Sequence, residues 1–169
     1  MTKQLTAQKI RSRLFTLLAG GALALVCVVV ILTFRGPPRL PILTPEDFDA
    51  ARQAWRDNKP ESYEITVKVT GRQPGIYHVQ VQNGIAESAS LDGRPLRNRR
   101  TLGTWAVNGM FETIRLDLVN NAEHGHLMLG ADFDPQLGFP SRYERIEIRT
   151  GAHDALQWEV IEFKTEENG

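Results

Sequence analysis

The chain has 169 residues, which is enough for one domain of ordinary size and an appendage. Its formal net charge is zero, but the charges are unevenly distributed. All 20 acidic residues lie from Glu46 onward, whereas six of the 20 basic residues precede Glu46. The part from Glu46 onward therefore has 20 acidic and 14 basic residues. This acidic balance argues against nucleic acid as a partner, and the single cysteine, Cys27, excludes an intrachain disulfide.

The N-terminal part predicts a membrane anchor. A basic stretch, residues 1–13, precedes 21 residues without charge at 14–34. A helix of that length spans about 31 Å, close to the hydrocarbon thickness of a bilayer. The run lacks the small-x-small site of a cleaved signal peptide, so we expect an uncleaved single-pass transmembrane helix, with cleavage as the alternative. The basic flank favours a cytoplasmic N-terminus and places the remaining chain outside the cytoplasm.

Residues 35–43 contain prolines that cannot continue a helix, and they predict a stiff linker. A folded domain is expected over residues 44–169. Its first helix is predicted over about 45–57, because Thr44 before Pro45 has the pattern of a helix N-cap. The residues predicted to share the apolar face of this helix are Phe48, Ala51 and Trp55.

After residue 60 the apolar period changes to two and predicts three strands, at 63–70, 77–82 and 85–90. Asn83-Gly84 offers the positive φ angles of a tight hairpin turn between the last two. The basic segment 94–100 is predicted to be a solvated loop, with an anion or acidic-partner contact as the functional alternative.

A second helix is predicted over about 108–120, followed by three strands near 127–133, 146–148 and 158–163. The order helix, three strands, helix, three strands predicts an α+β domain with an antiparallel sheet and two helices packed on one face. The transmembrane helix would precede it. The three tryptophans, Trp55, Trp105 and Trp158, are predicted to pack in the core.

Candidate chemical groups do not match a known catalytic or metal pattern. His124 and His126 are predicted to start a strand on one face, without further ligands in reach. A calcium loop starting at Asp132 would need glycine at its sixth position and glutamate at its twelfth, which are Leu137 and Tyr143. We therefore expect no catalytic residue, no metal ion and no cofactor.

The segment from Phe133 to Pro140 is instead predicted to be a hairpin turn. Asp134 can accept from backbone amides two residues on, Pro135 fixes φ, and Gly138 can adopt a left-handed conformation. Phe133 and Phe139 are the expected core anchors. The predicted structural signature turn comprises Phe133, Asp134, Pro135, Gly138, Phe139 and Pro140.

The order of features resembles a bacterial family catalogued as domain of unknown function 6174. The resemblance covers nearly all of residues 46–164, and its most specific element is the turn aromatic-Asp-Pro-x-x-Gly-aromatic-Pro at 133–140. Members are small exported or lipid-anchored bacterial proteins. The resemblance therefore implies a domain on the outer side of the bacterial cytoplasmic membrane, periplasmic or extracellular, and it brings no activity or binding residue with it.

From these patterns we expect a membrane-anchored, extracytoplasmic domain that binds a protein partner at the cell envelope and has no catalytic activity. The alternative is a module that binds a small ligand or a lipid, and a third candidate is an unrecognised hydrolase. The sequence does not indicate an oligomeric state.

Overall fold

The computed structural model describes residues 40–71, 73–148 and 151–165. The predicted cytoplasmic segment 1–13 and transmembrane helix 14–34 lie outside this part of the chain. Within the described residues, no helix has both the length and the apolar character needed to cross a bilayer.

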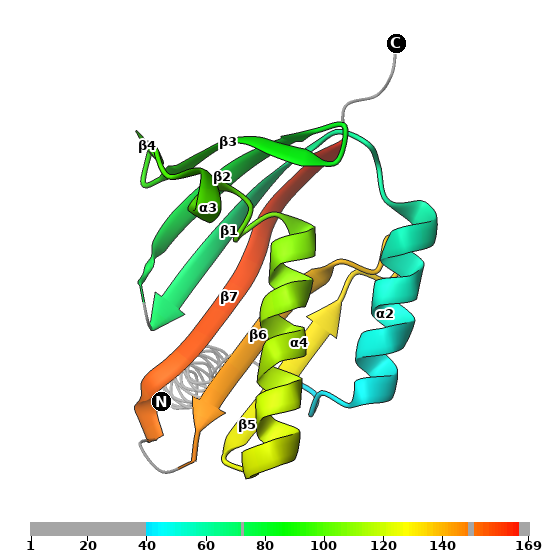
Figure 1. The fold of residues 1–169 in the computed structure, drawn as a ribbon, viewed down its shortest axis with the longest axis vertical. Helices are drawn as coiled ribbons and strands as arrows, with labels where there is room; N and C mark the ends of the chain where they lie inside the picture. The colour runs from blue at the N-terminus through cyan, green and yellow to red at the C-terminus, as the bar shows by residue number, and fades with distance from the viewer. Residues whose placement is uncertain (1–39, 72, 149–150, 166–169) are drawn as a thin grey trace, which may run out of the picture. The chain divides into compact units, whose positions relative to one another are not determined.

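A seven-stranded antiparallel sheet forms the folded unit, in the order β4-β3-β2-β1-β7-β6-β5 (Figure 1). The strands are β1 Tyr63–Gly71, β2 Gly75–Gln82, β3 Ile85–Leu91, β4 Arg94–Pro95, β5 Leu127–Phe133, β6 Pro140–Glu147 and β7 Gly151–Thr165. Each half of the sheet is built from consecutive hairpins. The first and the last strand, β1 and β7, join the two halves at the centre.

Two long helices, α2 (Pro45–Asn58) and α4 (Val107–His124), lie on one face of the sheet (Figure 1). A single-turn helix, α3 (Arg99–Leu102), lies beside β3. The opposite face carries no helix in the described part of the chain, and we call it the open face. The predicted α+β class and antiparallel sheet are confirmed.

Helix α2 begins where the sequence predicts it because Thr44 caps its N-terminus. The Thr44 hydroxyl accepts from the Asp47 amide at 3.1 Å, and Pro45 occupies the first turn, where a missing amide hydrogen costs nothing. The buried face carries Phe48, Ala51 and Trp55. Trp55 Nε1 also donates to Asn108 Oδ1 at 3.1 Å, which links α2 to α4.

Helix α4 receives no side-chain cap from its own N-cap residue, Ala106. Tyr63 of β1 supplies the acceptor instead, since the Val107 amide donates to Tyr63 Oη at 3.1 Å. The helix ends at Gly125, which adopts a left-handed φ of 61°. The predicted end near residue 120 is therefore wrong. His124 is the last residue of the helix and does not start a strand, because helical hydrogen bonding continues up to Gly125, whose left-handed conformation ends the helix.

The basic segment 94–100 is not a loop throughout. Asp92 and Gly93 have positive φ angles of 49° and 76°, and this tight turn sends the chain back as β4, paired with β3. Helix α3 follows. The sheet thus has seven strands rather than the predicted six, because a two-residue strand is too short to show a period-two pattern.

The core fills the space between the sheet and the two long helices. Trp55 is its centre and contacts Tyr63, Phe139 and Phe163 edge to face, with ring centroids between 5.6 and 6.4 Å apart. Burying a large apolar side chain contributes about 1.5–3 kcal/mol. The inward residues of β1 that complete this layer are Tyr63, Ile65, Val67 and Val69, all buried.

The segment before α2, residues 40–43, lies along the outer edge of β5. Ile42 pairs with Gly130 in an antiparallel bridge, and two backbone hydrogen bonds of 3.0 and 3.2 Å flank the pair. The compact unit thus begins at Leu40. That is upstream of Thr44, where the sequence predicts the domain to begin.

Candidate functional site

The predicted signature turn, Phe133–Pro140, connects β5 to β6. The Asp134 carboxylate accepts from the amides of Gln136 and Leu137 at 3.0 and 2.8 Å, and the Gly138 amide donates to the Asp134 carbonyl at 2.9 Å. Gly138 has a φ of 82°, in the left-handed region that side chains disfavour. Because these bonds stay within the turn, Asp134 holds the backbone in shape rather than presenting a free ligand.

The same turn packs against α2. A Cβ added to Gly138 would lie 2.5 Å from the Ala51 carbonyl oxygen and 2.9 Å from the Trp55 amide nitrogen, so glycine permits the close approach. Phe139 is buried, contacts Trp55 and stacks on Phe163 with centroids 4.5 Å apart. The turn is therefore a structural corner of the domain, against which α2 packs.

A buried carboxylate, Asp117, joins α4 to the sheet. Tyr143 Oη donates to one of its oxygens at 2.8 Å, and Arg145 Nη1 lies 2.9 Å from the other. Burial, together with the Asp117 charge, raises the pKa of Tyr143 well above its ordinary value. The three groups satisfy one another, which makes this cluster a structural link between layers.

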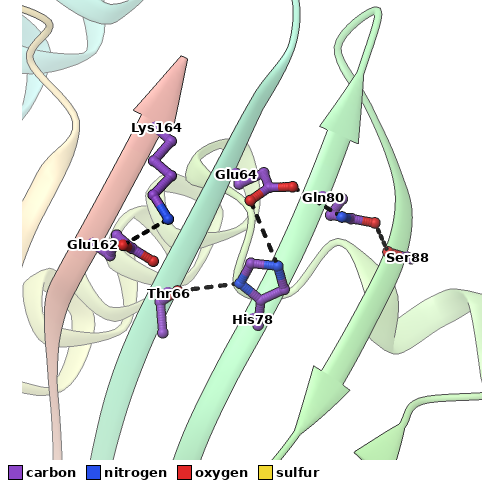
Figure 2. A network of polar contacts seen from close by, with 7 residues as sticks. All are labelled: Glu64, Thr66, His78, Gln80, Ser88, Glu162 and Lys164. Atoms are coloured by element: carbon purple, nitrogen blue, oxygen red, sulfur yellow. Dashed lines mark hydrogen bonds and ion pairs between the residues drawn. The ribbon is translucent and has the colours of Figure 1, made fainter. Parts of the chain in front are cut away.

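The open face carries a network of polar side chains across β3, β2, β1 and β7 (Figure 2). Ser88 Oγ donates to Gln80 Oε1 at 2.7 Å, and Gln80 Nε2 donates to Glu64 Oε1 at 2.9 Å. The other Glu64 oxygen lies 4.0 Å from His78 Nε2. The second ring nitrogen of His78, Nδ1, lies 3.1 Å from Thr66 Oγ1.

On β7 the network ends in an ion pair between Glu162 and Lys164, with 2.8 Å between Oε1 and Nζ (Figure 2). The hydrogen bond from Lys164 lowers the pKa of Glu162. Both side chains are exposed, so the pair contributes little to stability.

Thr66, His78 and Glu64 have the residue types of a hydroxyl-imidazole-carboxylate relay, which nucleophilic catalysis uses. Their surroundings differ from those of a catalytic relay. The side chains of His78 and Glu64 are 38% and 35% exposed, on an open strand face. Catalysis of this kind works in a site that excludes water, whereas the side chains of His78 and Glu64 stay open to solvent.

Exposed apolar side chains gather at the β5–β6 end of the open face. Met128 is 56% exposed and pairs across the strands with Ile146. Ile42, which is 78% exposed, pairs with Gly130 on the same face, and the amide of Ile148 continues the β5–β6 pairing one step further. We call this group the apolar patch. Its members are the exposed Ile42, Met128 and Ile148 and the partly buried Ile146 between them in the sheet.

A pocket of about 410 Å³ lies near the other edge of the sheet, on the helix-bearing side. Its lining includes Tyr77, Leu91, Leu96, Thr101, Thr104 and Trp105. Trp105 was predicted to be a core residue, but it is only partly buried and forms a wall of this pocket. No sequence signal marks it, because the segment between α3 and α4 has no apolar period. Trp55 and Trp158 are buried as predicted.

The two histidines singled out by the sequence do lie together, with ring centroids of His124 and His126 5.7 Å apart. In the described residues, no group of three or more His, Cys, Asp or Glu side chains is arranged to hold a metal ion. The other candidate ligand, Asp132, bonds to Arg142 instead.

With this geometry in view, comparison with known proteins gives one result. The profile of a family of unknown function, DUF6174, matches residues 47–165. The chain belongs to the DUF6174 family. No curated protein and no solved structure matches it. In this DUF6174 domain the turn that carries the sequence resemblance, residues 133–140, is the corner that seats α2. The polar network, apolar patch and pocket lie elsewhere on the DUF6174 fold.

Proposed function

We propose that this protein is a membrane-anchored, extracytoplasmic domain that binds another protein and has no catalytic activity of its own. The observation that carries the proposal is the apolar patch on the open face. Contiguous exposed apolar residues with a polar border are typical of protein-binding surfaces. Here the border consists of side-chain pairs between Arg142 and Asp132 and between Gln157 and Glu144.

The position of the patch supports a partner close to the membrane. The uncharged run 14–34 supports an anchor, and the compact unit begins at Leu40. The intervening residues 35–39 reach at most about 18 Å when fully extended. Ile42 belongs to the patch and follows directly, so the patch lies at the end of the domain where the chain enters. We propose that the partner presents an apolar surface to this patch and is itself located at the membrane.

The alternatives have weaker support. The hydrolase alternative depends on Thr66, His78 and Glu64, which lie on an open face. The ligand-binding alternative has one observation in its favour, the pocket beside Trp105. The space between the sheet and the long helices is occupied by the aromatic core around Trp55.

Site-specific photo-cross-linking in cells tests the proposal on the full chain. A photoreactive phenylalanine analogue at Met128 should give a discrete cross-linked product with one protein. The matched control is Leu116 on α4, which is 53% exposed against 56% for Met128 but lies away from the open face. Adding Ile42→Glu should abolish the product from position 128. Identical products from both positions, or none from position 128, would refute the proposal.

A further inference from the structure

The pocket beside Trp105 has a rigid aromatic wall. The rings of Trp105 and Tyr77 lie 5.0 Å apart and are inclined by 36°, and Trp105 also rests edge-on against the buried Trp158 at 5.5 Å. The Tyr77 hydroxyl donates to the Gln73 carbonyl at 3.2 Å, which fixes the second ring. These contacts fix the two rings before any ligand binds. Preformed apolar surfaces of this kind bind the flat or chain-like apolar part of a small molecule.

The opposite wall comes from β3 and β4. Leu91 pairs with Tyr77 on one side and with Arg94 on the other. Directly paired residues of antiparallel strands point to the same face of the sheet. Arg94 therefore lies on the pocket side, next to Leu91, and Leu96 lies two residues further along on that side and lines the pocket.

Arg94 is not itself a lining residue, but its position beside Leu91 on the pocket side of β4 puts its long, charged side chain within reach of the rim. Its side chain is exposed, and no acidic side chain lies within ion-pair distance of it in the described residues. The nearest acid in the turn, Asp92, is engaged, because one carboxylate oxygen accepts from the Ile76 amide at 2.9 Å. An arginine without a partner beside an apolar cavity complements an anion with an apolar body.

We propose that this pocket binds a small organic acid with an apolar body. The body packs against Trp105, Leu91 and Leu96, and the anionic group pairs with the Arg94 guanidinium at the rim. Thr104 also lines the pocket, and its hydroxyl is a hydrogen-bond donor that the anionic group could use. This site is independent of the apolar patch, which lies on the other face of the sheet.

The test is calorimetric titration of the full chain in detergent, with matched micelle blanks, using two probes that share a naphthalene body and differ in whether their polar group is anionic or neutral. They are 2-naphthoate and its neutral analogue 2-naphthamide. The wild-type chain should bind the acid about tenfold more tightly than the amide, because a charge-assisted hydrogen bond is worth about 1.5 kcal/mol or more. Arg94→Gln should remove this preference, and Arg56→Gln, an exposed arginine on α2, should leave it unchanged.

Two further variants test the pocket itself. Trp105→Leu should weaken both probes together, since it removes the aromatic wall. Thr104→Asp, at an exposed lining position that tolerates a charge, should weaken the acid alone and covers the case in which Trp105→Leu fails to fold. The proposal is overturned if the acid and the amide bind equally, if neither binds, or if Arg94→Gln has no more effect than Arg56→Gln. Loss of the cross-linked product from position 128 would leave these results unaffected.

Discussion

Replacing Gly138 with alanine should destabilise the domain in two ways, through its backbone angle and through its contact with α2. The left-handed φ of 82° costs an alanine about 1–2 kcal/mol. The added Cβ would also lie 2.5 Å from the Ala51 carbonyl oxygen and 2.9 Å from the Trp55 amide nitrogen. Both atoms belong to the backbone of α2 and cannot move without shifting the helix, and forced overpacking of this kind costs about 1–3 kcal/mol.

The matched control is Gly84→Ala. Gly84 has a φ of 75° in the hairpin turn between β2 and β3, and an added Cβ there meets no atom within 4 Å. It therefore shares the backbone cost of Gly138→Ala but lacks the contact with α2. Both variants gain about 0.4–1 kcal/mol from a less flexible unfolded chain, so this term cancels in the comparison.

The difference in unfolding free energy between the two variants measures the contribution of the close contact between residue 138 and α2. We expect Gly138→Ala to be less stable than Gly84→Ala by about 2 kcal/mol in urea unfolding, or about 8 °C in thermal midpoint for a domain of this size. Circular dichroism should follow both transitions. Equal losses would show that only the backbone angle matters, and the account of the turn as the corner under α2 would be wrong.

Two more predictions concern buried polar groups. Asp117→Ala should lower the free energy of unfolding by about 3–5 kcal/mol in urea titration, because it leaves Arg145 without its partner. Asp117→Asn keeps an acceptor for Tyr143 and should lower the free energy of unfolding by less. Equal losses in the two variants would contradict this account. Burial raises the pKa of Tyr63 to about 12, so the stability it contributes is present below pH 10 and should fall by about 2 kcal/mol as the pH rises from 10 to 12. Tyr63→Phe should reduce this loss of stability at high pH. At neutral pH the same substitution should lower the free energy of unfolding by about 1 kcal/mol, since the Val107 amide loses its acceptor. If the stability of the variant depends on pH as the wild type does, the raised pKa of Tyr63 is refuted.

The parts of the fold that the sequence predicts well depend on neighbouring residues. Thr44 and Pro45 start α2 by capping it, and Asn83-Gly84 adopts the positive φ angles of 51° and 75° that the tight turn requires. The same holds for the turn at 133–140, where Asp134 and Gly138 act on amides within the turn itself. A few adjacent residues determine these local hydrogen bonds and backbone angles, so the sequence predicts them.

The parts that the sequence does not predict depend on contacts between distant residues. The pairing of β1 with β7 joins the two ends of the domain, and the acceptor that Tyr63 offers to Val107 crosses from the sheet to a helix. Periodicity marks a strand around Ile146 but not which face it occupies. Arg145 takes the inward position because Asp117 on α4 neutralises it there, which leaves Ile146 on the open face. The apolar patch therefore became visible only with the tertiary structure.

Residues 40–43 also determine how a pulling force would enter the fold. Tension carried by the preceding chain arrives first at this segment, which two backbone hydrogen bonds hold against β5. Each hydrogen bond contributes about 1 kcal/mol net, and the buried side chain of Leu43 adds about 1.5–3 kcal/mol. Together they contribute less than the burial of Phe48 and Trp55 and the three aromatic contacts of Trp55, which hold α2. The segment would detach before α2 does, lengthen the tether by up to about 14 Å, and uncover an unpaired strand edge at Gly130. For the proposed membrane anchor this means two tether lengths, and only the longer one leaves β5 open to another strand.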